Sequence, residues 1–179
     1  MMNRFRWILT KRKFKYLGTG SCIKMPVYIK NPKYIKIGNK WSGLWNIRIE
    51  AWDQYFDQHF TPEIIIGDNV EMNSDIHIGC INKVIIGNNV LMASRIFITD
   101  HMHGNSDSSD LHLPPAKREL VSKGPVIIED NVWIGEGVSI LSGVTIGKNS
   151  IIGANAVVTK SFPENSVIGG VPAKLIKSI

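Results

Sequence analysis

The sequence contains little cysteine and no long apolar run. Its 179 residues include only Cys22 and Cys80, which excludes a disulfide scaffold and a zinc-finger-like module and favours a reduced, cytoplasmic protein. No run approaches the roughly 18 apolar residues of a transmembrane helix. No apolar stretch with a small-residue cleavage site follows the basic start, so we expect no signal peptide. The hydrophobic content of 44% and charged content of 20% are typical of one globular domain.

The excess of positive charge is confined to the first 18 residues, and the rest of the chain has none. The formal net charge is +6, and residues 1–18 carry six basic and no acidic residues, which leaves 15 basic against 15 acidic residues in the rest of the chain. A neutral body gives little support for nucleic-acid binding. Aromatic and aliphatic residues alternate with the basic ones over 1–19, so this segment suits either an anionic membrane surface, such as the inner membrane, or docking on its own protein.

A six-residue repeat dominates residues 20–179. The aliphatic positions of its longest run are Ile128, Ile134, Ile140, Ile146, Ile152 and Val158. An earlier block has the same period, with a step of eight between Ile78 and Ile86 that indicates a two-residue insertion at a corner. Six fits neither a helix nor simple alternation, but it fits a short strand followed by a bend rich in Gly, Asn and Asp. Three such segments make one coil, and coils stack as parallel strands. The sequence therefore predicts an all-β parallel β-helix.

The last coils carry motifs of a known family. These are the segments 131–135, 142–147 and 152–160 and the ending Gly169-Gly170-Val171-Pro172-Ala173-Lys174. The sequence resembles the hexapeptide-repeat acyltransferases, with a pattern similar to sugar, maltose, galactoside and polysaccharide O-acetyltransferases. The resemblance implies a left-handed parallel β-helix and a homotrimer with active sites between subunits. It also implies acetyl-CoA as the cosubstrate, with no metal.

The repeat lapses between Ile98 and Ile128, where a polar excursion near 101–125 leaves the coil. His101 and His103 stand at its root, and an imidazole can take a proton at neutral pH. The run Ile98-Thr99-Asp100-His101 is similar to the family stretch that ends in the catalytic histidine. The resemblance implies that His101 is the general base that activates an acceptor hydroxyl; His103 is the second candidate.

Acceptor and coenzyme positions also follow from the resemblance. Asn73 matches an asparagine that contacts the acceptor, and a bend residue is the alternative. Asp75 could orient His101 or bind a sugar hydroxyl. The coenzyme positions are Glu136, Ala154, Thr159, Lys160, Lys174 and Lys177. Trp41, Trp45 and Trp52 suit a sugar ring, a buried cap or a subunit interface.

The hypothesis that results is a cytoplasmic acetyl-CoA-dependent O-acetyltransferase that modifies a sugar hydroxyl, in surface polysaccharide biosynthesis, by direct transfer. N-acetylation of an amino sugar or of an antibiotic is chemically close. Two other classes stay open: a metal enzyme resembling γ-type carbonic anhydrases, through His77, His101 and His103, and a non-catalytic β-helix that serves as a binding module.

Overall fold

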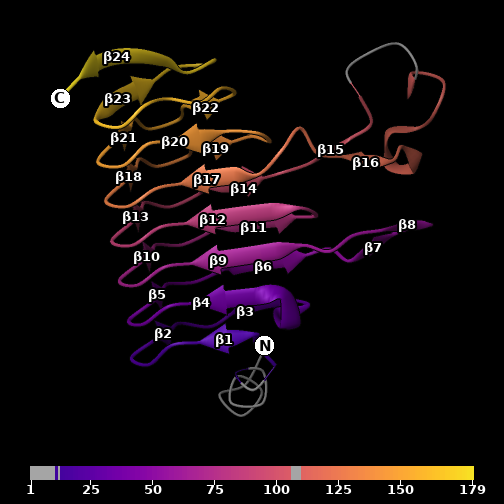
Figure 1. Cartoon of the computed structure of the whole chain (residues 1–179), viewed down its shortest axis with the longest axis horizontal. Helices are drawn as coiled ribbons and strands as arrows, with labels where there is room; N and C mark the ends of the chain where they lie inside the picture. Colours follow the sequence, from indigo (N-terminus) through magenta and orange to yellow (C-terminus); the bar gives the residue numbers. More distant parts are fainter. Residues whose placement is uncertain (1–10, 12, 106–109) are drawn as a thin grey trace.

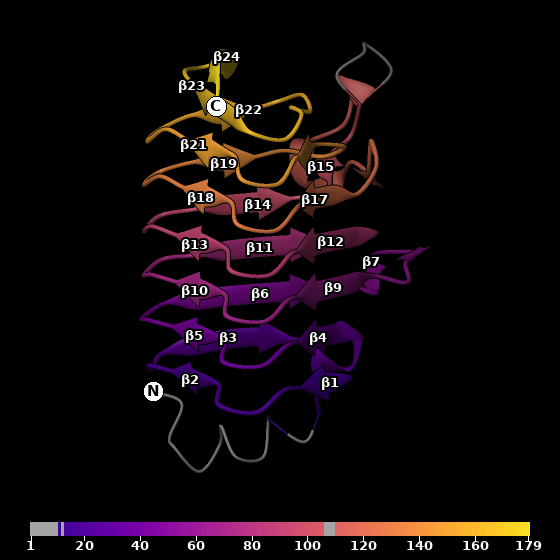
Figure 2. The same ribbon diagram turned by 60° about the vertical axis from the view of Figure 1, so that its left-hand side comes forward.

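The chain winds into a stack of three-sided coils (Figures 1 and 2). This computed structural model describes residues 11, 13–105 and 110–179. Most of the basic segment 1–19 therefore lies outside the described residues. Its last part belongs to the stack, because Tyr16 and Leu17 pair in parallel with Lys36 and Ile37. The coil thus begins a few residues before residue 20.

Three parallel sheets form the sides of the stack. Sheet A contains β1 (Tyr16–Leu17), β4 (Ile35–Ile37), β9 (Glu63–Ile66), β12 (Lys83–Ile86), β17 (Val126–Ile128) and β20 (Thr145–Ile146). Sheet B contains β2 (Cys22–Ile23), β5 (Ser42–Gly43), β10 (Glu71–Met72), β13 (Leu91–Met92), β18 (Trp133–Ile134), β21 (Ile151–Ile152), β23 (Ser166–Gly169) and the antiparallel β24 (Lys174–Ser178). Sheet C contains β3 (Val27–Lys30), β6 (Ile47–Ala51), β11 (His77–Cys80), β14 (Phe97–Thr99), β19 (Ser139–Ile140) and β22 (Val157–Val158).

The interior of the stack is filled by the aliphatic positions of the repeat. All six residues of the longest run are at most 1% exposed. The residues four places after the first five, from Val132 to Ala156, are also buried, and Phe162 closes the column at 6%. Because each buried residue stacks on its equivalent in the next coil, the period of six seen in the sequence is the period of the core. The expected two-residue insertion is also present, as Ile81 and Asn82 between β11 and β12.

The corner between sheets A and B is regular. Asn69, Asn89, Asn131, Asn149 and Asn165 all have positive φ, between 55° and 60°. Their amides form a ladder in which each Nδ2 donates to the Oδ1 of the next asparagine, at 3.0–3.1 Å. Asparagine tolerates this left-handed conformation better than most residues. The recurring Asn at the bends is therefore a structural feature of this corner.

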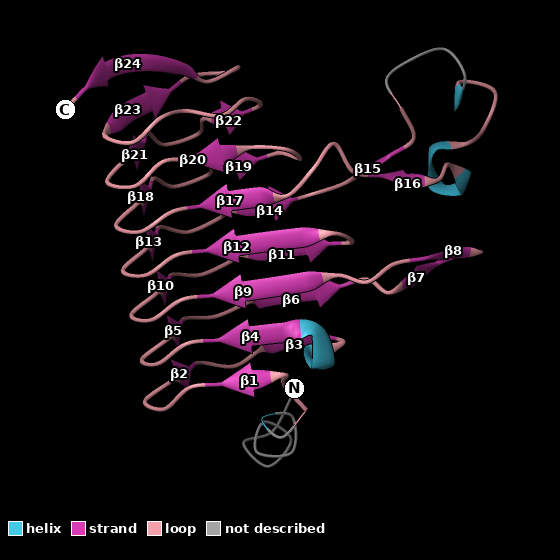
Figure 3. Cartoon of the chain, viewed as in Figure 1, coloured by secondary structure: helices cyan, strands magenta, loops and turns pink. Residues whose placement is uncertain are grey.

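The corner between sheets C and A holds every longer departure from the coil, within the described residues. Here lie η1 (Pro32–Tyr34), the hairpin of β7 (Gln54–Tyr55) and β8 (Gln58–His59), and the excursion, with β15 (Met102–His103), η3 (Pro115–Lys117) and β16 (Leu120–Val121). The hairpin and the excursion project to the same side of the stack (Figures 1 and 3). They touch, because Gln58 exchanges two hydrogen bonds with the backbone of Leu120.

Candidate active site

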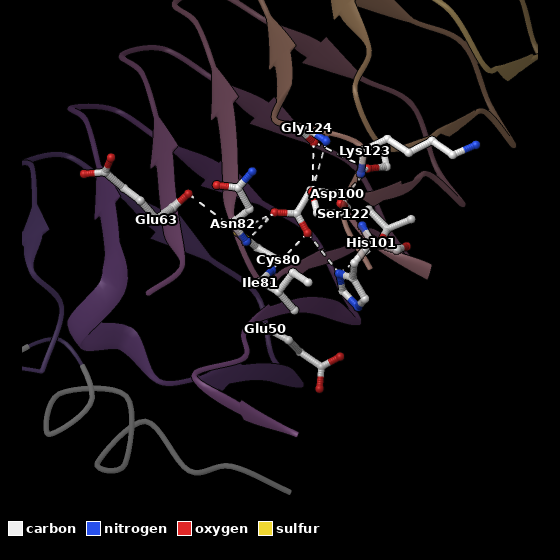
Figure 4. A network of polar contacts seen from close by, with 12 residues as sticks. Glu50, Glu63, Cys80, Ile81, Asn82, Asp100, His101, Ser122, Lys123 and Gly124 are labelled. Carbon is white, nitrogen blue, oxygen red and sulfur yellow. Dashed lines mark hydrogen bonds and ion pairs between the residues drawn. The ribbon is translucent and has the colours of Figure 1, made fainter. Parts of the chain in front are cut away.

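His101 follows β14 at the C–A corner, where the excursion leaves the coil. Its Nδ1 lies 2.9 Å from Oδ1 of Asp100, and its side chain is 14% exposed. Asp100 is completely buried. Figure 4 shows the imidazole reaching outward from this buried carboxylate. The pair thus places a proton-accepting ring at the surface on a fixed internal support.

The insertion at the next coil down supplies the partners of Asp100. The backbone N–H groups of Ile81 and Asn82 donate to Oδ1 and Oδ2 at 2.9 and 2.8 Å, and the Cys80 thiol donates to Oδ2 at 3.2 Å. Burial and the nearby Asp100 raise the pKa of Cys80, so the thiol keeps its proton. All these groups are donors, an arrangement that an ionised carboxylate can satisfy. The two extra residues that interrupt the repeat therefore build the support for His101.

These contacts set the tautomer of His101. Since Asp100 is already an acceptor for the surrounding donors, its bond to His101 requires a proton on Nδ1. The Nε2 atom of the neutral ring is then unprotonated and can accept a proton. This arrangement leaves Nε2 able to accept a proton, which the role implied by the sequence resemblance requires.

The backbone around His101 is braced from the coil above. The Ser142 hydroxyl donates to the carbonyl oxygen of Asp100 at 2.6 Å and accepts from the N–H of Lys123 at 2.7 Å. Asp100 is where the excursion leaves the coil and Lys123 is where it returns. One buried serine thus joins the two ends of the excursion, and Figure 4 shows Asp100 and Lys123 close to each other at these ends.

The imidazole also depends on a glycine beside it. A Cβ at Gly79 would lie 3.2 Å from Cε1 of His101, closer than side chains normally pack. Gly79 lies beside the ring because it belongs to β11, which pairs with β14, the strand that His101 follows. The absence of a side chain at Gly79 leaves the space that the ring occupies.

A cavity of about 320 Å³ opens beside His101 on the outer face of sheet C. Trp52, Tyr55 and Phe97 contribute apolar walls, and Glu50 lies at its edge. The Tyr55 hydroxyl donates to the carbonyl oxygen of Ala116, so the hairpin and the excursion together close one side. The cavity therefore combines aromatic surface with a general base.

A second polar group lines the same cavity. Oε2 of Glu50 accepts from Nη2 of Arg48 at 2.7 Å and lies 3.0 Å from Nε2 of His77. Burial lowers the pKa of His77, against the raising effect of Glu50. Neutral His77 therefore donates its Nε2 proton to Glu50. This group lies near enough to His101 for the charge of His101 also to lower the pKa of His77, but the carboxylate that bonds His101 is Asp100.

The predicted acceptor residues lie at different corners. Asn73 and Asp75 form the bend between sheets B and C, and Asp75 accepts from Nδ2 of Asn46 at 2.9 Å. Asp75 therefore does not orient His101 within this chain, because His101 lies across sheet C; Asp100 has that role. His103 is exposed, and its Nδ1 lies 3.3 Å from the Tyr55 hydroxyl. It lines the cavity, but no carboxylate of the described residues bonds to it.

The tryptophans of the aromatic segment divide between packing and the cavity. Trp41 is completely buried in the coil, so it packs. Trp45 is 48% exposed at the B–C corner, beneath Lys24. Trp52 lines the cavity, and the Lys30 ammonium lies over its ring. The sequence alone did not separate these three cases.

The predicted coenzyme residues are all exposed on the last coils. Glu136 and Ala154 lie at the B–C corner, and Thr159 and Lys160 follow β22 at the C–A corner, on the same edge of the stack as His101. Lys174 and Lys177 lie on β24. Glu136 forms an ion pair with Arg95 at 2.6 Å.

Two general findings concern the described part of the chain. It has no helix long and apolar enough to cross a bilayer. Within the same residues, no three His, Cys, Asp or Glu side chains are grouped as metal ligands.

Comparison with known proteins defines the class first. Residues 125–160 match the family model described as bacterial transferase hexapeptide (six repeats). A solved hexapeptide-repeat-containing acetyltransferase from Vibrio cholerae, complexed with acetyl-CoA, matches with a TM-score of 0.57 at 28% identity, over 97% of this chain and 76% of that one. The fold is thus that of the hexapeptide-repeat transferases, the left-handed parallel β-helix.

Two curated relatives from Escherichia coli K12 extend the match. The putative lipopolysaccharide biosynthesis O-acetyl transferase WbbJ is 42% identical over 159 residues, 87% of this chain and 77% of that protein. Galactoside O-acetyltransferase is 33% identical over 176 residues, 96% of this chain and 67% of that protein. The chain therefore belongs to the hexapeptide-repeat acetyltransferase family, and the expected fold and enzyme class, an acyltransferase, are confirmed.

Sequence reasoning missed three parts of the site: the carboxylate of Asp100, the group around Glu50, and the contact between hairpin and excursion. Asp100 stands directly before His101, and the step of eight between Ile78 and Ile86 marks its donors. Glu50 has no such signal, because its partners Arg48 and His77 come together only through strand pairing in sheet C.

Proposed function

We propose that the protein transfers an acetyl group from acetyl-CoA to a hydroxyl of a sugar, with His101 as the general base. The observation that carries the proposal is the Asp100–His101 pair, in which Asp100 bonds Nδ1 and the imidazole lines a cavity with aromatic walls. Supporting it, WbbJ and galactoside O-acetyltransferase are named as O-acetyltransferases. The WbbJ name further suggests a sugar of a surface polysaccharide or of its precursor as the acceptor.

The proton path follows from the geometry of His101. As the acceptor oxygen bonds to the thioester carbonyl carbon, Nε2 takes the hydroxyl proton, and Asp100 stabilises the imidazolium that forms. When the carbon–sulfur bond breaks, the imidazolium returns the proton to the leaving thiolate. Acetyl-CoA supplies the activated acyl group in this scheme.

Direct transfer fits the nearby nucleophiles. The Ser142 hydroxyl is engaged with the carbonyl oxygen of Asp100, and the buried Cys80 thiol has a raised pKa. Neither contacts Nε2 of His101, so neither is activated as an acyl carrier. The acetyl group therefore passes straight to the acceptor.

The residues of the last coils fit a coenzyme with several phosphates. Lys160, Lys174 and Lys177 are exposed, and none of them forms an ion pair with a described residue. They are therefore free to neutralise phosphate as point charges. Glu136 is already paired with Arg95, so at this position the backbone is the better candidate for a contact.

We also propose that the active unit is a homotrimer with the site shared between subunits. Asn73, Glu136 and Ala154 lie at the B–C corner, whereas His101 and Lys160 lie at the C–A corner. A neighbouring copy can bring the two corners together. Leu91 and Trp133, paired on the outer face of sheet B and 41% and 51% exposed, offer an apolar contact for it. A cytoplasmic location, with the basic residues 1–19 at the inner membrane surface, belongs to the same proposal.

The test is acetyl-CoA-dependent thiol release with a panel of acceptors. Methyl glycosides of galactose, glucose and mannose are compared with glucosamine, which offers an amine. Thiol release with the glycosides, absent in the His101→Ala variant, is the expected result. Release only with glucosamine would replace O-acetylation by N-acetylation. Release that does not require His101 would contradict the assignment of the base.

A further inference from the structure

Glu50 is a buried charge that the proposed proton path does not use. Its side chain is 4% exposed, and it lines the cavity together with His101. Figure 4 shows both residues on the same side of the coil, with the Glu50 carboxylate below the imidazole ring. Glu50 and His101 lie two levels apart in the stack, because β11 stands between β6 and β14, and Gly79 on β11 leaves the space between them open.

The two oxygens of Glu50 differ in their partners. Oε2 accepts hydrogen bonds from both Arg48 and His77, at 2.7 and 3.0 Å. Among the residues that the structure describes, no hydrogen bond to Oε1 is present. Taking a carboxylate out of water is costly unless its oxygens are hydrogen-bonded. Oε1 is therefore an acceptor without a donor at the edge of a cavity.

The walls of the cavity indicate what kind of donor would meet Oε1. Trp52, Tyr55 and Phe97 present flat apolar surface within the same cavity. A ligand that packs against aromatic rings needs a face of C–H groups. A ligand that donates a hydrogen bond to a carboxylate needs a group such as a hydroxyl at its edge. A neutral sugar ring has both. An anionic ring would be repelled by the Glu50 carboxylate. The nearby cation of Arg48 would not offset this repulsion, because it is already paired with Glu50.

We propose that Glu50 selects the acceptor: its Oε1 accepts a hydrogen bond from a hydroxyl of a neutral sugar ring, and a second hydroxyl of that ring faces Nε2 of His101. This inference rests on the proposed function and names the residue that recognises the acceptor. Arg48 and His77 are positioning residues, because they hold the carboxylate through Oε2 and leave Oε1 toward the cavity. The part of the acceptor site that Glu50 belongs to is lined by sheet C, the hairpin and the excursion of one chain.

The substitution Glu50→Gln tests this directly. Glutamine keeps the shape, but its oxygen is drawn to the donors Arg48 and His77, which turns its NH₂ group toward the cavity. We expect the KM for the best methyl glycoside to rise about 10- to 100-fold, the size of a lost hydrogen bond to a charged group. Since the bond is present before and during the reaction, kcat should stay within about threefold. The Kd for acetyl-CoA should not change.

The matched control is Glu129→Gln, an exposed glutamate at the A–B corner that accepts from the N–H of Lys148, a bond that glutamine can keep. It should leave KM, kcat and the unfolding temperature unchanged. If Glu50→Gln folds poorly, Phe97→Ala carries the test. Phe97 is 37% exposed and walls the cavity, and its loss should raise KM about two- to tenfold through lost ring contact.

Binding of the methyl glycosides is also followed by saturation-transfer NMR without acetyl-CoA. Binding to the wild-type chain that is lost in Glu50→Gln supports the inference. An unchanged KM in Glu50→Gln, or no glycoside binding to the wild-type chain, overturns it. If glycosides bind through Glu50 but no acetyl group is transferred, the proposed function fails while this recognition site stands.

Discussion

Two corners of the same coil follow different rules. At the A–B corner, asparagines with positive φ repeat in every coil from Asn69 to Asn165, and their side chains pair only with one another. At the C–A corner, the chain inserts two residues at Ile81, a hairpin at Gln54 and an excursion at His101. The first corner is built by repetition, and the second by interruption.

The difference shows where chemistry can arise in a repeat protein. The asparagine side chains of the ladder bond to one another, and none of them lines the cavity beside His101. The interruptions create a buried carboxylate, Asp100, with donors from one coil and an imidazole on another. They also create the cavity. In this molecule the regular A–B corner makes the stack rigid, and the rigid stack holds the side chains of the irregular C–A corner in fixed positions.

The largest effect is expected from His101→Ala. Loss of the general base should reduce kcat about 10²- to 10⁴-fold, while the Kd for acetyl-CoA, measured by calorimetry, stays the same. His112→Ala, an exposed histidine on the excursion, is the matched control and should keep full activity. Comparable turnover in the two variants would break the link between the irregular corner and catalysis.

The core of the coil should show its effect in stability. Ile134→Ala removes a completely buried side chain from the ladder and should lower the free energy of unfolding by about 2–5 kcal/mol. Ile151→Ala, on the outer face of sheet B and only half-buried, should cost less. Denaturant unfolding of both variants measures the difference. Equal losses would mean that the repeat does not form the core.

Asp100→Asn separates support from chemistry. The amide cannot accept the surrounding donors and His101 Nδ1–H as the carboxylate does, so we expect kcat to fall about 10²-fold, with a lower unfolding temperature. Asp75→Asn changes a carboxylate at the B–C corner whose partner is Asn46. It should have little effect on either quantity, and a fall in kcat as large as for Asp100→Asn would contradict the support given to His101.

Lys160→Ala tests the coenzyme side of the C–A corner. Removal of one exposed cation should raise the Kd for acetyl-CoA about three- to tenfold, with little change in the turnover of the bound complex. Because exposed charges are screened by salt, the difference should shrink as ionic strength rises. An unchanged Kd at low salt would remove Lys160 from the coenzyme site.

The smallest effect concerns Glu63, a carboxylate on the regular face of sheet A. Hydrogen bonds from Lys36 and Lys83 lower the pKa of Glu63. A lowered pKa stabilises the fold above the unfolded-state value and ceases to do so as pH falls through the folded-state value. Glu63→Gln should therefore cost about 0.5–1 kcal/mol at pH 7 and nothing at pH 2–3, with normal activity throughout. A pH-independent loss would contradict this.

The sequence predicts the coil well but the candidate site only in part. The period of six predicts the buried ladder, because a residue's place in the coil is fixed by local chain geometry. His101 was identified by the interruption and by resemblance. Its support by Asp100, rather than Asp75, depends on which corner each residue occupies on two neighbouring coils. Glu50 could not be found, because its contact with His77 arises from strand register across 27 residues of chain, although Arg48 lies on the same strand as Glu50.

The most direct test of the central claim is the protonation of the two ring nitrogens of His101, observed by ¹⁵N-edited NMR of histidine-labelled protein and assigned with His101→Gln. The structure predicts that the neutral ring carries its proton on Nδ1, bonded to Asp100, and leaves Nε2 bare toward the cavity. In Asp100→Asn this preference should weaken. A neutral ring protonated on Nε2 in the wild-type chain would contradict the account, because Nε2 could then not take the proton of the sugar hydroxyl.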